Sequence, residues 1–289
     1  MRSQKEIALD SKITGRLSAL LSSGTSAGQS PAAGQTSAAG QGAALAIAKL
    51  LLHDDEIQAL QEYANTVSIK RLNYNDHCPV HMRTVALNSL IMMGLLRDAG
   101  IKTSLEKEEC GSFEDSVIAV LLAAILHDIG MSVGRQDHEL HSSYLAYPIL
   151  DRLLGKVFPK AVEKRVIIRS LALEGISGHM GNRIIHSLEA GVILVADGCD
   201  MQKGRARIPM ALAEHPKVGD IHKYSANSIE EVRIGKGTEK PIRIDVSMSS
   251  EVGLFQIEEV LLQKIAASTA RVYIELYAQV NEGGPKRYL

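Results

Sequence analysis

The sequence predicts a mainly α-helical protein that carries a small α+β unit at its C-terminal end. Apolar residues recur at helical spacing over most of residues 45–203. After about residue 228 the spacing changes to the alternation that is typical of strands. The 289 residues divide into four predicted parts: an N-terminal segment (1–23), a flexible linker (24–44), a helical domain (45–227) and the α+β unit (228–289).

The first 44 residues fall into two unlike parts. The stretch IALDSKITGRLSALL has roughly helical apolar spacing, so we expect a short helix within residues 1–23. Residues 24–44 are small and polar, and the triplet Ala-Gly-Gln occurs there three times. Such residues cannot bury enough apolar surface to offset the entropy of ordering, which predicts a flexible linker.

The helical domain is centred on one strongly apolar segment. VIAVLLAAIL is apolar on every face, so we expect a buried central helix over residues 113–129. Ser112, with Asp115 three residues later, is typical of a helix start, and Gly130 is typical of a helix end. Further helices are predicted at 81–98, 138–155 and 160–175.

Residues 187–203 are ambiguous. GVILVA could be a buried strand, because a short apolar run has no period that distinguishes strand from helix. Ser187 and Glu189 instead look like the start of a helix. The sequence leaves both interpretations open.

The C-terminal unit is predicted to be β-β-α-β. EEVRI and PIRIDVSM alternate apolar and polar residues with GKGTEK between them, which indicates a hairpin. Residues 254–269 read as an amphipathic helix, and RVYIELYAQV alternates again as a strand. This unit would cover a cleft or mediate a dimer. Its strand edges would need covering, which slightly favours a homodimer.

Composition limits the partners and the compartment. The apolar share of 45% and charged share of 22% are ordinary for a globular protein, and a net charge of −1 argues against nucleic acid as a main partner. The longest apolar run has ten residues, short of the ~20 that a membrane span needs, so we expect no membrane association. Three cysteines without CxxC spacing, and no signal peptide, predict a cytoplasmic protein with reduced thiols.

The strongest indication of chemistry is His127-Asp128, which follows the most apolar helix. An isolated aspartate there would be costly to ionise, so it needs a partner or a bound cation. Imidazole nitrogen together with carboxylate oxygen suits a divalent ion. Three further pairs have helical spacing: His77 with His81, His138 with His141, and Asp197 with Asp200.

The order His81, His127-Asp128, Asp197 resembles the H…HD…D signature of the HD superfamily of metal-dependent phosphohydrolases. The surrounding segments HMRTVALNSL, VLLAAILHDIG, DHELHSSYLAYPIL and SLEAGVILVADGCDM are similar to the helices of that superfamily. The resemblance covers roughly residues 70–205 and implies an HD-domain helical bundle around the metals. NDHCPVH, DMQKGRARIP, DIHKYSA and GLFQIEEVLLQK resemble archaeal and bacterial HD proteins described only as metal-dependent phosphohydrolases. That closer likeness implies that the C-terminal unit belongs with the HD domain, and it supplies no substrate.

Carried over motif by motif, the resemblance implies two divalent transition-metal ions (Mn, Fe, Co, Ni or Mg). The ligands it implies for the first ion are His81, His127, Asp128 and Asp197. His138 and His179 match the extra histidines of two-metal members, and Asp128 would bridge the ions. His77 is left as a ligand, or as a residue that contacts the substrate or supports a metal ligand. The chain lacks the HD-GYP signature loop, which argues against a cyclic dinucleotide substrate.

The implied chemistry is hydrolysis of a small phosphoester, such as a nucleotide, by a metal-activated water. Lys203, Arg205 and Arg207 follow Asp197 and could bind the phosphate, with Arg135 as a further candidate and His222 and Lys223 as weaker ones. A solvated basic turn is an equal interpretation of that run. Two other functions stay open: a di-iron oxygenase of the HD type, and a module that senses a nucleotide without turnover.

Overall fold

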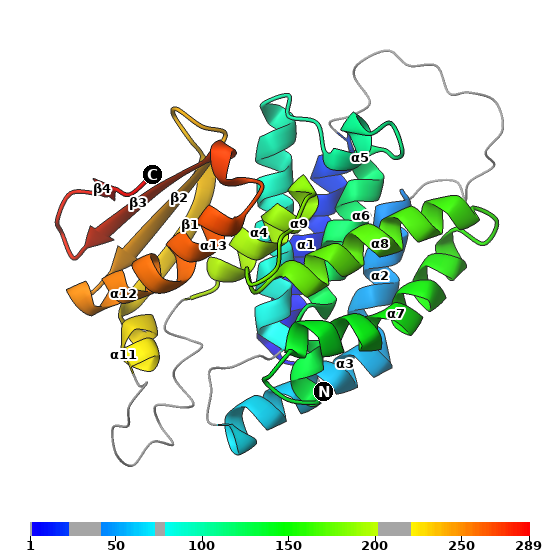
Figure 1. The fold of residues 1–289 in the computed structure, drawn as a ribbon, viewed down its shortest axis with the longest axis horizontal. Coiled ribbons are helices and arrows are strands. Elements are labelled where there is room, and N and C mark those ends of the chain that lie inside the picture. Colours follow the sequence, from blue (N-terminus) through cyan, green and yellow to red (C-terminus); the bar gives the residue numbers. More distant parts are fainter. Residues whose placement is uncertain (1, 23–41, 73–78, 202–220) are drawn as a thin grey trace.

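The computed structural model describes residues 2–22, 42–72, 79–201 and 221–289, apart from the side chains of His222 and Lys223. This described chain is mainly α-helical with a four-stranded sheet at its C-terminal end, as the sequence predicts. The sheet lies at one side of the helical bundle (Figure 1). The bundle is made of α1 (Gln4–Ser22), α2 (Ala43–Leu52), α3 (Asp55–Thr66), α4 (Pro79–Asp98), α5 (Ser104–Lys107), α6 (Phe113–Leu126), α7 (His138–Val157), α8 (Val162–Gly178) and α9 (Leu188–Gly198).

Helix α6 is the central helix, as its composition predicts. Every residue from Asp115 to Leu126 is buried, and α2, α4, α8 and α9 contact the helix. Ser112 and Asp115 form a capping box at its start, so the predicted cap is confirmed. The segment Phe113–Ser132 is long and apolar enough to cross a membrane, but 94% of its apolar window is buried inside the protein. It therefore serves this fold as a core helix.

The predicted end of α6 needs a correction. The helix ends at Leu126, and a 3₁₀ turn, Ile129–Ser132, follows it. Gly130 lies in this turn where α7 passes very close to the backbone. A Cβ at Gly130 would lie 2.1 Å from the carbonyl oxygen of His138 and 2.4 Å from the amide nitrogen of Ser142. Glycine is needed here for close approach rather than for a helix stop.

Helix α9 settles the ambiguity of residues 187–203, and helix α1 confirms the predicted N-terminal helix. Residues 187–203 contain helix α9, and the Ser187 side chain accepts a hydrogen bond from the Ala190 amide at its start. The predicted N-terminal helix is α1, which buries Ile13, Leu17 and Leu20 and packs along α4. The linker predicted at 24–44 lies almost wholly outside the described residues, although α2 already begins at Ala43.

The C-terminal unit follows helix α11 (Ile221–Ser228). Strands β1 (Ile229–Lys236) and β2 (Ile242–Met248) form the predicted antiparallel hairpin, and β3 (Ile274–Val280) pairs parallel to β2. The connection between β2 and β3 contains α12 (Leu254–Gln256), a π-helical turn (Ile257–Leu261) and α13 (Leu262–Ala267). A short strand, β4 (Lys286–Arg287), which the sequence did not predict, pairs with β3.

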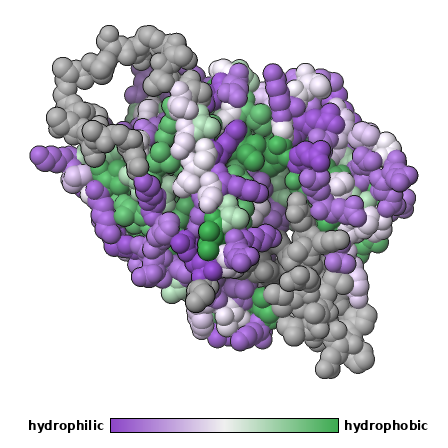
Figure 2. All heavy atoms as spheres, turned by 180° about the vertical axis from the view of Figure 1, so that it is seen from behind, coloured by the Kyte–Doolittle hydropathy of each residue, from purple (hydrophilic) through white to green (hydrophobic). Residues whose placement is uncertain are grey.

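The C-terminal unit packs on the bundle. Strands β1 and β2 contact α4, and α13 contacts α9. Ile242, Ile244 and Val246 belong to the same hydrophobic cluster as the helices of the bundle. The division at residues 227 and 228 therefore stays a prediction. Seen from behind, the surface is largely hydrophilic with smaller hydrophobic patches (Figure 2), in contrast to the apolar interior.

Candidate metal centre

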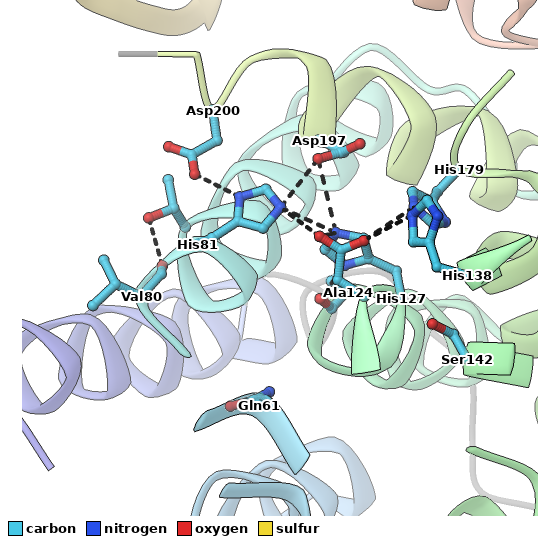
Figure 3. A network of polar contacts seen from close by, with 12 residues as sticks. Gln61, Val80, His81, Ala124, His127, His138, Ser142, His179, Asp197 and Asp200 are labelled. Atoms are coloured by element: carbon cyan, nitrogen blue, oxygen red, sulfur yellow. Dashed lines mark hydrogen bonds and ion pairs between the residues drawn. The ribbon is translucent and has the colours of Figure 1, made fainter. Parts of the chain in front are cut away.

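Five elements bring histidine and aspartate side chains to one buried point (Figure 3). His81 lies in the first turn of α4, and His127 and Asp128 follow the last turn of α6. The remaining side chains come from the start of α7, the end of α8 and the last turn of α9: His138, His179 and Asp197. The four imidazoles and Asp128 are at most 2% exposed.

One half of the cluster combines His81, His127, Asp128 and Asp197. The Nε2 atoms of His81 and His127 lie 3.2 Å apart. Oδ2 of Asp128 lies 3.3 Å from Nε2 of His81 and 3.5 Å from Nε2 of His127. Oδ1 of Asp197 lies 3.2 Å and 3.8 Å from the same two nitrogens. Four donor atoms from three segments thus face one point, which we call the first position.

The other half combines His138, His179 and Asp128. The Nε2 atoms of His138 and His179 lie 3.2 Å apart. Oδ1 of Asp128 lies 3.2 Å from Nε2 of His138 and 3.3 Å from Nε2 of His179. We call this the second position. Asp128 therefore presents one carboxylate oxygen to each histidine pair.

All four imidazoles are anchored through Nδ1. Each Nδ1 donates to an acceptor: His127 to the Ala124 carbonyl (2.8 Å), His138 to the Arg135 carbonyl (3.0 Å), His179 to the Ile176 carbonyl (2.7 Å) and His81 to Asp200 Oδ2 (2.6 Å). A carbonyl oxygen only accepts, so Nδ1 of three of these rings carries the proton, and the Asp200 carboxylate has the same effect on His81. With Nδ1 protonated, a neutral ring leaves Nε2 as a bare lone pair that is turned inward.

These bare nitrogens fit a metal ion. Two lone pairs 3.2 Å apart repel each other unless a cation lies between them. An ion with bonds of about 2.1 Å has neighbouring ligand atoms about 3.0 Å apart in octahedral and about 3.4 Å apart in tetrahedral geometry. The observed separations of 3.2–3.8 Å lie in or just above this range. The overlapping triads could therefore hold one or two metal ions.

Charge at the centre also suits a cation. Burial, the largest influence, lowers the pKa of His179 from 6.5 to about 4, so this ring is neutral near pH 7. Burial acts to raise the pKa of Asp197, but the Lys264 ammonium holds it well below 3.8. Neutral imidazole and ionised carboxylate are the forms that bind metal.

Two residues that were not among the predicted site residues belong to this arrangement. Asp200 holds Nδ1 of His81, and its spacing from Asp197 was the only sequence signal for it. Lys264, on α13, donates from Nζ to Oδ2 of Asp197 and to the carbonyl oxygen of His179, the latter at 2.9 Å. Lys264 ends the segment GLFQIEEVLLQK, which resembles HD proteins, but nothing in the sequence assigned it a role at the site, because its position depends on how the C-terminal unit packs.

Some predicted residues have other positions. Arg135 supplies its backbone carbonyl to His138, and its side chain is half-buried. The candidate ligand His77 and the candidate phosphate-binding residues Lys203, Arg205 and Arg207 lie outside the described residues. Their roles therefore stay predictions.

Comparison with known proteins gives one informative match. No family model and no solved structure matches the chain. The uncharacterized protein MJ1020 of Methanocaldococcus jannaschii is 43% identical over 235 residues, which are 81% of this chain and 88% of that protein. The chain therefore belongs to the protein family that includes MJ1020.

Proposed function

We propose that this chain is a metal-dependent phosphohydrolase of the HD superfamily that uses two divalent ions. The main support is the position of Asp128 between two histidine pairs, with one carboxylate oxygen facing each pair. A carboxylate in this position suits a bridging ligand. A pair of ions in such a site supplies an activated water and neutralises the charge of a phosphoryl group.

The side chains of the centre would have separate roles in holding the ions and binding the phosphate. The histidine pairs and Asp197 would fix the two ions, and Asp128 would join them. Burial of these ligands excludes bulk water, which strengthens every electrostatic interaction at the centre. Lys203, Arg205, Arg207 and Arg135 remain our candidates for binding the phosphate.

The substrate we propose is a small phosphoester such as a nucleotide. A net charge of −1 gives no general attraction for nucleic acid, so recognition would depend on local positive groups near the centre. We further propose a cytoplasmic protein that acts on its substrate away from the membrane, as a homodimer if the sheet edge of the C-terminal unit pairs.

The first test is hydrolysis of 4-nitrophenyl phosphate and bis(4-nitrophenyl) phosphate with added Mn²⁺, Fe²⁺, Co²⁺ or Ni²⁺. We expect metal-dependent release of nitrophenol that falls at least about 100-fold in Asp128→Asn, since a bridging ligand matters more than the residues behind the ligands. Asp151→Asn is the matched control, because Asp151 is an exposed aspartate on α7. Equal activity of the two variants would contradict the proposal.

A second function is supported by the same donor set. Four imidazoles and two carboxylates also suit iron, which other HD-type proteins use for oxygen chemistry. Iron in the purified protein, a mixed-valence spectroscopic signal and oxygen uptake without phosphoester turnover would favour the oxygenase. Tight nucleotide binding without any product would favour a sensor instead.

A further inference from the structure

The C-terminal unit supplies a positive charge to the candidate metal centre. Lys264 lies on α13, between strands β2 and β3. Its side chain is only 12% exposed, and its Nζ contacts both Oδ2 of Asp197 and the carbonyl oxygen of His179. The lysine therefore joins a ligand of the first position to the chain segment that carries a ligand of the second.

The two oxygens of Asp197 have different partners. Oδ1 faces Nε2 of His81 and His127 at 3.2 and 3.8 Å, whereas Oδ2 accepts from Lys264. A carboxylate can give a metal ion one oxygen or both. An ammonium bound to Oδ2 holds that oxygen away from the first position.

We propose that Lys264 is a positioning residue that keeps Asp197 a one-oxygen ligand. The inference rests on the metal centre proposed above. If Asp197 gave both oxygens, it would occupy a place that a catalytic ion keeps for water or substrate. Lys264 would thus preserve an open coordination position without touching the substrate.

The packing of α13 supports a built contact rather than a chance surface pair. A Cβ at Gly198 would lie 3.1 Å from Cδ of Lys264, so glycine in α9 leaves room for the lysine stem. The segment after α13 is fastened to α9 as well. Oγ of Ser268 donates to the Gly191 carbonyl at 2.9 Å, and Oγ1 of Thr269 donates to the Ser187 carbonyl at 2.6 Å.

The loss of Lys264 should have different effects on metal binding, depending on whether the lysine only forms a structural ion pair or positions Asp197. Breaking a structural pair would loosen the centre, so Lys264→Met would bind metal more weakly. Loss of a positioning lysine removes a repelling charge and frees Oδ2, so metal binding would be unchanged or tighter. Activity would fall because the open position is lost.

The test compares Lys264→Met and Lys264→Arg with the wild type and with Lys236→Met, an exposed lysine of β1. Each metal-free protein is titrated with Mn²⁺ for stoichiometry and affinity, and then with Co²⁺ for its visible absorption. For Lys264→Met we expect full Mn²⁺ stoichiometry with equal or tighter affinity. We also expect weaker Co²⁺ bands, which indicate a higher coordination number, and partial recovery of the wild-type spectrum in Lys264→Arg.

Turnover of the nitrophenyl phosphates gives the second readout. We expect kcat of Lys264→Met to fall about 100-fold while KM changes by less than about threefold. Loss of a Mn²⁺ equivalent, or a Co²⁺ spectrum identical to that of the wild type, would overturn the proposal. If the wild type binds Co²⁺ but hydrolyses nothing, the spectra still decide the role of Lys264, and only the phosphohydrolase function fails. If the wild type binds neither metal, both proposals are wrong.

Discussion

At the scale of single residues, the centre depends on what lies behind each imidazole. Three of the rings donate from Nδ1 to the carbonyl three residues earlier: His127 to Ala124, His138 to Arg135 and His179 to Ile176. These local contacts satisfy backbone carbonyls, two of them in the last turns of α6 and α8. His81 instead uses the distant Asp200. Its orientation therefore depends on tertiary structure.

Asp200→Ala tests this second contact. The change removes the acceptor 2.6 Å from Nδ1 of His81, so the ring can turn or carry its proton on the other nitrogen. We expect Mn²⁺ affinity at the first position to fall by about 10–100-fold. Calorimetric titration with Mn²⁺ measures this affinity. Asp98→Ala is the control, because Asp98 is an exposed aspartate at the end of α4. Unchanged affinity would show that Asp200 does not set the orientation of His81.

The pH dependence of the metal-free protein follows from His179. Its pKa is about 4 in the folded chain against 6.5 ordinarily, so the unfolded state binds more protons between these values. The contribution of His179 to the free energy of unfolding should therefore be complete above about pH 6.5 and decrease as the pH falls toward 4. Below that, the contribution is lost. Urea unfolding in the presence of a chelator, at a series of pH values, measures this slope.

His179→Gln should flatten the slope, whereas the exposed His53→Gln should leave it unchanged. A wild-type protein whose stability did not decrease between pH 6.5 and 4 would contradict the neutral, buried state of His179. Glutamine retains a polar side chain at this position and removes the titration.

At the scale of elements, the junction between α6 and α7 determines where His138 lies in the second position. His138 is the first residue of α7, and its carbonyl oxygen lies where a side chain on Gly130 would be. The Gly130 amide also donates to Oγ of Ser142 at 2.8 Å. The close approach of the two backbones here places His138 beside Asp128.

Gly130→Ala should move the start of α7 and His138 with it. We expect a loss of stability of about 1–3 kcal/mol from overpacking, and Mn²⁺ binding at the second position to weaken. Gly134→Ala is the matched control, because a Cβ there would meet nothing within 4 Å. Chemical denaturation and Mn²⁺ titration measure the two effects. Equal behaviour of the two variants would mean that the junction tolerates a shift.

The sequence predicted most elements because their signals are local. Helix α6 has an all-apolar run and a capping box, and the β1–β2 hairpin has alternation on both sides of a polar turn. Helix α9 was ambiguous because GVILVA is buried on every side, and only Ser187 and Glu189 at its start distinguish helix from strand. Strand β4 has two residues, too few for any period.

At the scale of the whole molecule, the centre is a product of packing. The resemblance to HD proteins pointed to His81, His127, Asp128, His138, His179 and Asp197, which the structure brings together. Spacing alone could not show that α4, α6, α7, α8 and α9 meet at one point. Lys264 is the clearest example of a residue that sequence spacing could not place at the centre. It lies 67 residues after Asp197 in the sequence and reaches it only through the docking of the C-terminal unit.

The proposed two-ion centre is tested most directly by metal content. Mass spectrometry would count metal in protein purified without added metal and after reconstitution with Mn²⁺, for the wild type, Asp128→Ala and the control Asp151→Ala. Since Asp128 faces both positions, we expect about two equivalents in the wild type and the control, and a large loss in Asp128→Ala. One equivalent in the wild type would contradict the bridging role of Asp128. No metal in any of the three proteins would contradict the metal centre itself.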